Sequence, residues 1–527
     1  MVHHFHHRKI IVKKIIFMKL VFLMLGIGVL LFNLYQNDLN NMKEYMAKSY
    51  LLLLEEKIKE FKEVSDGSNN DIFSISVGIN KEKDYAESIP VLVYHGIISN
   101  SDEYNVLLKV FYGQMLALKK AGYNTITLQE FYQFMKENKS VPKQSFLLTF
   151  DDGRKDSYYS ADPILKSLNY TAIMFVITKF SMGEEKSGYY LSKKELKGML
   201  QSGRWEIQAH TREGHNLYEI DRKGNQGHYY SNKLWLSNEQ RLETDEEFRI
   251  RIAVDLLSAK KEIEEKLNVD IYGFAYPFGD FGQDSLNHPN ATQMIEDEVK
   301  KIYEFTFYQV GAGRGDIFNY PNKNEYKIKR IEIRYDWTPE NLIAILESGR
   351  NKELPFYDNF SEYKGWIKVY GESTLTEESL VVSADRGKNS ATVFLDGAKE
   401  WSNYLYHINA EQIKGDYLSL LAYYQDEENY IECNYQKNKT RINIMKNGKK
   451  TEIMSSENKR AFVDKKRDVA IKIVDGSIEC YIGEVLVLRS ESRSVRKSKG
   501  GIGIKIWDKK QDNAEIRVHE VNVGVNE

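Results

Sequence analysis

The chain has 527 residues, of which 42% are hydrophobic and 28% are charged, and its formal net charge at pH 7 is −2. A chain of this length is too long for one ordinary domain, so we expect two or three domains. The near-neutral charge and the lack of a long basic stripe in the globular part of the sequence exclude nucleic-acid binding as the main function.

The first segment, residues 1–35, has the pattern of a basic cytoplasmic flank followed by a membrane anchor. Lysines and histidines precede LVFLMLGIGVLLF, and the largely apolar stretch of residues 15–35 approaches the roughly 20 residues that span a bilayer. Because the lysines lie on the N-terminal side, we expect a single-pass anchor in the cell membrane with the bulk of the chain outside. No small residues mark a cleavage site after this stretch, so a cleaved signal peptide is the lesser alternative.

The next segment, residues 36–88, is predicted to form an amphipathic stalk helix and a polar linker. Apolar residues recur at three- and four-residue steps between Leu39 and Phe61, which places them on one helix face. This face offers a short dimer seam for self-association, although about three heptads is marginal for a coiled coil.

Strand-like and helical runs alternate through residues 89–350. The strand-like runs are VLVYHGI, SFLLTF, TAIMFVIT, WEIQAHT, YGFAYPFG, FYQVGAG and IKRIEIRYD. Helical patterns such as residues 245–267 lie between several of them. The alternation predicts an α/β domain with a largely parallel sheet or distorted (β/α) barrel.

Helical patterns stop before residues 356–527, where short alternating strands are punctuated by Gly, Asn and Asp. This pattern is typical of an all-β sandwich or jelly roll. Its aromatic residues offer a stacking platform for sugar rings, although each one alone is more typical of a core. These residues are Trp366, Trp401, Tyr423, Tyr424 and Trp507.

The only two cysteines, Cys433 and Cys480, lie in this region. They are too few for a disulfide framework, and neither has a C-x-x-C partner, so a cysteine-based zinc site is excluded. The sequence leaves open whether they form one disulfide or remain buried free thiols, of which we favour the second.

Five strand-like runs of residues 89–350 end in polar or aromatic residues, at the place where a parallel barrel collects its functional side chains. Alone, each of these motifs is common in turns and cores, but the coincidence at five strand ends favours a functional site. The residues are His95; Asp151 and Asp152; His210 with nearby His215; Tyr276 and Pro277; and Asp336 and Trp337.

The two histidines after the fourth run favour a metal site. His210 and His215 are five residues apart, which is about 140° on a helix, so a loop that turns at Gly214 fits them better. Two imidazoles and one carboxylate form the usual facial set for a divalent metal that keeps open positions for water.

LLTFDDG, HTREGH, AYPFG and YDW together resemble the motifs of the NodB-type polysaccharide deacetylases, carbohydrate esterase family 4, over roughly residues 89–350. The histidine spacing, the AYPFG form and the early VLVYHGI segment are most similar to the exopolysaccharide branch, which acts on poly-N-acetylglucosamine-type biofilm polymers. The resemblance implies an extracellular, metal-dependent hydrolase that removes N-acetyl groups from a GlcNAc polymer. The alternatives are peptidoglycan or an O-acetylated glycan as substrate, or a non-catalytic surface protein that binds carbohydrate.

The resemblance also implies roles for single residues. Asp151 matches the general base, and Asp152, His210 and His215 match the metal ligands, with zinc as the default metal. Substrate contacts, and an oxyanion-binding backbone N–H near the first of them, are expected at Tyr276, Pro277, Phe278, Asp336 and Trp337.

The sequence departs from the family pattern in two ways. The late Leu-x-His motif of the general acid is missing, and His95 is the expected substitute because the exopolysaccharide branch places this histidine near the domain's start. Ala275 stands near the arginine that usually braces the base, which leaves Arg330 and Arg334 as replacements.

Two regions outside the motifs have open roles. The insertion of residues 217–244, with Tyr229, Tyr230 and Trp235, either walls a sugar-binding groove or packs on the barrel, and His228 and His288 are expected at the rim. The C-terminal region resembles the concanavalin-like jelly rolls of sugar-binding modules by pattern alone. A carbohydrate-binding role for it therefore stays open beside a purely structural one.

Overall fold

The computed structural model describes residues 42–65, 85–183, 187–311, 317–376, 378–457, 466–496, 498–511 and 513–525. The predicted membrane anchor, residues 1–35, lies outside these ranges. Within them, no helix combines the length and the apolar character needed to cross a bilayer.

A closed barrel of parallel strands forms the first domain, as the alternating sequence predicted. The strands follow the order β1–β15–β13–β12–β7–β6–β5, and β5 pairs with β1 to close the ring. Each strand coincides with one of the strand-like runs of the sequence. Those that are buried along their whole length, such as β1 and β6, are apolar throughout, because both of their faces are covered. The bounds are β1 (Ile89–Tyr94), β5 (Ser145–Phe150), β6 (Ala172–Val176), β7 (Trp205–Ala209), β12 (Gly273–Ala275), β13 (Phe305–Val310) and β15 (Lys327–Glu332).

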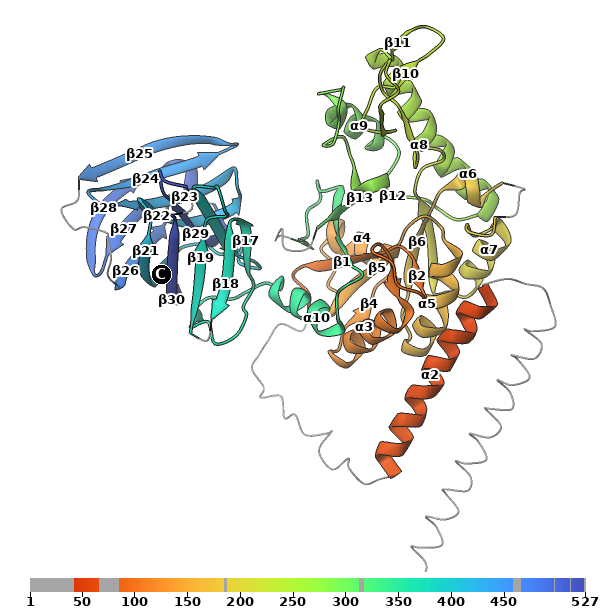
Figure 1. Cartoon of the computed structure of the whole chain (residues 1–527), viewed down its shortest axis with the longest axis horizontal. Coiled ribbons are helices and arrows are strands. Elements are labelled where there is room, and N and C mark those ends of the chain that lie inside the picture. Colours follow the sequence, from red (N-terminus) through yellow and green to blue (C-terminus); the bar gives the residue numbers. More distant parts are fainter. Residues whose placement is uncertain are drawn as a thin grey trace, which may run out of the picture.

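Helices cover the outside of the barrel (Figure 1). Four of them, α4, α7, α8 and α10, begin at a Ser or Thr that forms a capping box with the residue three positions later. The helices are α3 (Leu108–Lys120), α4 (Leu128–Glu137), α5 (Lys155–Leu168), α6 (Thr178–Ser181), α7 (Lys193–Gln201), α8 (Asp245–Leu267), α9 (Ala291–Val299) and α10 (Pro339–Ser348). Short strands flank them: β2 (Ile97–Ile98), β3 (Val106–Leu107), β4 (Asn124–Thr125), β8 (Leu217–Glu219), β9 (Gln226–His228), β10 (Trp235–Leu236), β11 (Arg241–Leu242) and β14 (Phe318–Asn319).

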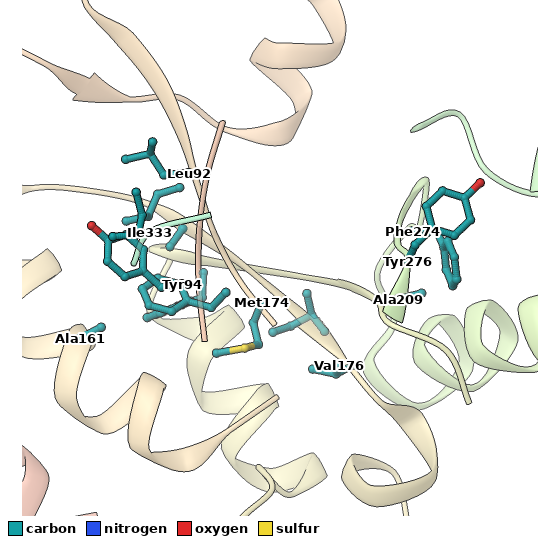
Figure 2. Close-up of a cluster of buried hydrophobic side chains, with 14 of the residues drawn as sticks. Leu92, Tyr94, Ala161, Met174, Val176, Ala209, Phe274, Tyr276 and Ile333 are labelled. Atoms are coloured by element: carbon teal, nitrogen blue, oxygen red, sulfur yellow. The ribbon is translucent and has the colours of Figure 1, made fainter. Parts of the chain in front are cut away.

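Alternate residues of the barrel strands enter two different hydrophobic clusters. Leu92 and Tyr94 of β1 and Met174 of β6 belong to the larger cluster, which also takes residues from α3, α5 and α8 (Figure 2). Val91 of β1 and Ile173 of β6 belong to a second cluster with residues of α4. Because neighbouring residues of a strand point to opposite faces, the first cluster fills the space under the outer helices and the second fills the barrel itself.

The predicted amphipathic helix is present as α2 (Met42–Ser65), and it packs along α5. Leu54 is buried, and the Ser49 hydroxyl donates a hydrogen bond to the carbonyl of Ser160, 2.8 Å away. Part of its apolar face is thus used within the chain, while self-association through it stays a prediction.

The C-terminal region consists of antiparallel strands, as predicted, and stands beside the barrel (Figure 1). Its two sheets share one hydrophobic core. One sheet contains β18 (Glu372–Thr376), β19 (Ser379–Ser383), β30 (Glu515–Val525), β21 (Tyr404–Lys414), β26 (Lys466–Val474), β27 (Ser477–Ile482) and β28 (Val485–Glu491), with β16 (Phe356–Asp358) paired to β30. The seven-stranded sheet contains β17 (Trp366–Tyr370), β20 (Ser390–Leu395), β29 (Gly501–Trp507), β22 (Tyr417–Asp426), β23 (Asn429–Gln436), β24 (Lys439–Lys446) and β25 (Lys449–Glu457).

The aromatic residues of this region divide between the core and one outer face. Trp366, Trp401 and Tyr423 are buried in the core between the sheets, so they do not form a stacking platform. Tyr424 and Trp507 belong to the opposite face of the seven-stranded sheet, away from that core.

The two cysteines form a disulfide between the sheets, contrary to the free thiols that the sequence favoured. Cys433 lies on β23 and Cys480 on β27, with their Cα atoms 5.8 Å apart. The sequence could not reveal this pairing because it depends on how two separate sheets face each other.

Removing this cross-link is expected to destabilise the C-terminal region. Cys433 and Cys480 are separated by 47 residues, and closing a loop of that length lowers the entropy of the unfolded chain by the equivalent of about 4 kcal/mol. We therefore expect the double variant Cys433→Ala/Cys480→Ala to unfold at lower denaturant concentration than the oxidised parent, measured by circular dichroism. A parent whose unfolding is the same with and without reductant would contradict this expectation.

Candidate active site

The carboxyl ends of the barrel strands bring together most of the residues singled out by the sequence. Asp151 and Asp152 follow β5, His95 follows β1, and His210 follows β7. His215 returns to the same place on the loop after β7, because its Nε2 lies 3.1 Å from Oδ1 of Asp152. The predicted gathering of strand ends is thus observed for these residues.

Asp152, His210 and His215 form a group whose ligand atoms all lie within 4.8 Å of one another. Nδ1 of His210 lies 2.8 Å from the carbonyl oxygen of Ala275. Because a carbonyl can only accept, this nitrogen carries the proton and Nε2 presents a lone pair toward Asp152, 3.5 Å away. Oδ1 of Asp152 is buried and accepts no hydrogen bond from the described residues. Lone pairs that converge without a proton between them fit a divalent cation, for which two imidazoles and a carboxylate are a suitable set.

Asp151 faces away from this group and forms a buried ion pair with Arg330 of β15. The two guanidinium Nη atoms lie 2.6 and 2.7 Å from the two carboxylate oxygens, and both side chains are fully buried. Burial opposes ionisation of Asp151, but the guanidinium and the neighbouring imidazoles outweigh it and hold the pKa of this carboxyl below its usual value. Arg330 therefore replaces the brace that the sequence lacks at Ala275, whereas Arg334 pairs with Asp336.

His95 lies on the other side of Asp151. Its Nε2 is 4.0 Å from Oδ2 of Asp151, and the side-chain amide of Gln309 is 3.1 Å from the same nitrogen. The hydroxyl of Ser157 donates to the His95 carbonyl and fixes the backbone at this point. The sequence reasoning missed Gln309. This residue lies one position before the end of β13, and the ends of the other strand-like runs had already supplied candidate residues.

Asp255 of α8 stabilises the loop that carries His215. The sequence reasoning missed this residue as well. Its carboxylate accepts hydrogen bonds from the backbone N–H groups of Arg212 and Glu213, at 3.1 and 2.8 Å. The Tyr230 hydroxyl donates to the same carboxylate. A Cβ at Gly214 would approach the Tyr230 ring to 2.3 Å, so close packing favours glycine there.

Three non-glycine residues with left-handed backbone conformation occur at these strand ends. They are Asp152, Thr211 and Phe278, with φ values of 70°, 77° and 60°. Such residues cost of order 1–3 kcal/mol each and persist where the surrounding structure over-determines them, as at functional sites.

The predicted substrate contacts differ in their exposure. Phe278 is 41% exposed, and its ring lies 4.7 Å from that of His215 and stacks on His228 at 4.4 Å. Tyr276 and Pro277 are buried, and the Tyr276 N–H donates to the carbonyl of Phe307. Their roles in substrate binding, and the role of a nearby backbone N–H in oxyanion binding, stay predictions.

The contacts expected after β15 differ in their surroundings. Trp337 is only 8% exposed and packs in the hydrophobic core, while its carbonyl accepts from Gln114, and its role as a substrate contact stays a prediction. Asp336 is exposed at the surface and paired with Arg334, and a role in substrate binding stays a prediction.

The insertion packs on the barrel. Tyr229 and Tyr230 are buried in the main hydrophobic cluster, which settles the alternative in favour of packing for these two residues. His228 lies beside Phe278, as expected for a rim residue, with its Nδ1 2.6 Å from Asp280. His288 is buried against the ring of Phe248, so the expectation that it lies at the rim is wrong.

Loosening the His215 loop is expected to weaken cation binding. The variant Asp255→Ala removes the acceptor for two backbone N–H groups, and loss of such a support lowers metal affinity by about 10–100-fold. Titration calorimetry with Zn²⁺ or Co²⁺ measures this loss. Asp162→Ala is the matched control, because Asp162 accepts hydrogen bonds from Arg204 and Trp205 instead. Equal affinity in both variants would contradict the role of Asp255.

The chain resembles known proteins over its barrel. Residues 138–295 match the polysaccharide deacetylase family. Poly-beta-1,6-N-acetyl-D-glucosamine N-deacetylase of Staphylococcus aureus (strain MRSA252) is 32% identical over 235 residues, which are 44% of this chain and 69% of that protein. The protein of the same name from Escherichia coli (strain K12) is 22% identical over 254 residues, or 44% of this chain and 36% of that protein.

Among solved structures, IcaB from Ammonifex degensii is 22% identical and aligns over 50% of this chain and 97% of its own, with a TM-score of 0.37. The match to the staphylococcal protein shows the family, since it covers more than two thirds of that protein at 32% identity. The chain belongs to the NodB-type polysaccharide deacetylases, hydrolases of carbohydrate esterase family 4.

Proposed function

We propose that this protein removes N-acetyl groups from an exopolysaccharide of the poly-β-1,6-N-acetylglucosamine type, outside the cell, with a divalent cation. The observation that carries the proposal is the pairing of two adjacent carboxylates with different partners: Asp151 with Arg330, and Asp152 with two imidazoles. The names of the staphylococcal and Escherichia coli relatives support the choice of polymer.

The fit of Asp152, His210 and His215 supports a cation, and zinc is the metal we propose. When bound, such an ion supplies Lewis acidity, which polarises the acetamide carbonyl and makes a water molecule more acidic.

Asp151 is suited to accept a proton from the attacking water. Arg330 keeps the carboxylate ionised and fixes its plane through two hydrogen bonds. The oxygen of that water forms a bond to the acetamide carbon, and the bond from this carbon to the sugar nitrogen then breaks. The products are acetate and a free amine.

His95 is suited to protonate the departing nitrogen. Its Nε2 lies 4.0 Å from Asp151, so the base and the acid both reach the same acetamide group. The Gln309 amide NH2 lies 3.1 Å from the same nitrogen and can only donate to it, so this contact orients the neutral ring before it takes up a proton, which makes Gln309 a positioning residue for His95.

The extracellular location remains part of the proposal. It is supported by the pattern of residues 1–35 and by the Cys433–Cys480 disulfide, because such bonds persist mainly outside the reducing cytoplasm. The intact base and ligand group favour an enzyme over a surface protein that only binds carbohydrate.

Acetate release from β-1,6-linked GlcNAc oligomers by the purified protein tests the proposal. We expect release to stop with a chelator and to resume with Zn²⁺, and we expect a fall of about 10²–10⁴-fold in Asp151→Asn and in His95→Ala. Release of acetate only from chitin oligomers or peptidoglycan would refute the proposed substrate but would agree with the proposed deacetylation reaction. If no acetate is released from any of these substrates and the protein binds no metal, the proposal that it is a deacetylase is refuted.

Loss of Arg330 is expected to change the pH dependence of this activity. Arg330 lowers the pKa of Asp151, and the base works only when deprotonated, so Arg330→Gln should shift the acidic limb of the kcat/KM profile to higher pH. Removing one partner of a buried ion pair also destabilises by about 3–5 kcal/mol, so Arg330→Lys, which keeps the charge, should shift the limb less. Arg334→Gln is the control, since Arg334 pairs with exposed Asp336 only. An acidic limb that stays in place in Arg330→Gln would contradict Asp151 as the base.

A further inference from the structure

The outer face of the seven-stranded sheet carries an unusual set of buried polar side chains. Along β22, Leu418 and Leu420 point into the core between the sheets. Tyr417, Ser419 and Leu421 therefore point outward, because neighbouring strand residues alternate between faces. Strand pairing extends this outer face from β17 to β25.

One row of this face, here called the polar row, crosses five neighbouring strands. Its members are neighbours in register: Thr392, Lys505, Ser419, Asn434 and Arg441. Thr392, Ser419 and Asn434 are only 3%, 0% and 2% exposed. Polar side chains on an outer sheet face normally reach water, whereas these three are buried.

Three buried polar atoms on this face have no hydrogen-bond partner among the described residues. Two are Oγ1 of Thr392 and Oε2 of Glu432, whose side chains are 3% and 1% exposed, and the third is Nε of Arg441. The other Glu432 oxygen accepts from Asn443, 2.7 Å away. An unsatisfied buried polar group costs about 1–3 kcal/mol, and a ligand that supplies hydroxyl or amide groups removes this cost.

Stacked aromatic rings flank the polar row. On one side, the rings of Tyr417 and Trp507 lie 5.4 Å apart and 15° from parallel. On the other side, Tyr424 stacks with Phe394 at 5.0 Å and with Tyr430 at 6.0 Å. Rings beside a few placed polar groups fit a pyranose, which has apolar C–H faces and a polar edge.

The charges on this face favour a neutral ligand over a charged one. Glu432 pairs with Lys450, and Arg441 lies 3.4 Å from Glu452. Lys505 adds a positive charge within the row, next to the Tyr430 hydroxyl at 3.5 Å. The face has no strong field to attract a polyanion, and Lys505 repels a polymer whose amines are free and protonated.

A protein partner fits this face less well. Specific protein interfaces have an apolar core, but none of the large apolar side chains that are strongly exposed in the described ranges belongs to the polar row or its flanking aromatic residues.

We propose that the outer face of the seven-stranded sheet binds the acetylated polysaccharide on which the barrel acts, through sugar rings stacked on the partly exposed Tyr417 and Trp507 and hydrogen-bonded to the polar row. This inference rests on the proposed function for the identity of the polymer. It assigns the C-terminal region a preference for acetylated over deacetylated chains, so that the region holds substrate and releases product.

Binding of oligomers to the full chain tests this inference. We use His95→Ala as the parent to slow turnover, and we titrate acetylated and de-N-acetylated β-1,6-linked oligomers by calorimetry. Tyr417→Ala in this parent should weaken binding of the acetylated oligomer by about tenfold, since buried aromatic contacts are typical hot spots. Thr392→Val keeps the shape of the side chain and should weaken binding several-fold.

Tyr481→Ala is the matched control, because Tyr481 lies on the outer face of the other sheet. We expect its affinity to equal that of the parent, and the deacetylated oligomer to bind more weakly than the acetylated one. Unchanged affinity in both Tyr417→Ala and Thr392→Val, equal loss in Tyr481→Ala, or equal binding of the two oligomers would overturn the inference.

The two proposals fail separately. If the wild-type chain releases acetate and Tyr417→Ala leaves oligomer binding unchanged, the proposed site on the sheet is refuted and the proposed deacetylase activity is supported. If oligomer binding depends on Tyr417 but the wild-type chain releases no acetate, the proposed deacetylase activity is refuted and the proposed carbohydrate site is supported.

Discussion

The buried ion pair between Asp151 and Arg330 is the interaction on which the proposed site depends. Two charges removed from water are costly unless they are closely paired, and here two short hydrogen bonds join them. The partners come from β5 and β15, which are separated in the barrel by β1 alone. Since His95 follows β1, the brace, the base and the proposed acid come from three adjacent strands at the point where the barrel closes.

The left-handed conformation of Asp152 allows two adjacent like charges to serve different partners. Asp151 points to the guanidinium inside the barrel, and Asp152 points to the imidazoles of His210 and His215. Arg330 compensates the charge of Asp151, and in our proposal the bound cation compensates that of Asp152. In our proposal this separation leaves one carboxylate free for proton transfer while its neighbour holds the cation.

Sequence patterns predicted the barrel and most of the site because both depend on local features. Apolar runs marked the strands, and polar residues at their ends marked Asp151, Asp152, His210 and His95. The choice of Arg330 over Arg334 was beyond the sequence, since it depends on which face of β15 points into the barrel. Asp255 was missed for a related reason: it reaches the histidine loop from a helix whose position only the fold reveals.

The contact between α2 and α5 has a mechanical consequence. Helix α5 begins three residues after Asp152, and α2 is bonded to it through Ser49 and Ser160. A helix of 24 residues is about 36 Å long and nearly rigid. A force applied at Met42, the first residue of α2, would therefore be transmitted to the side of the barrel through α5.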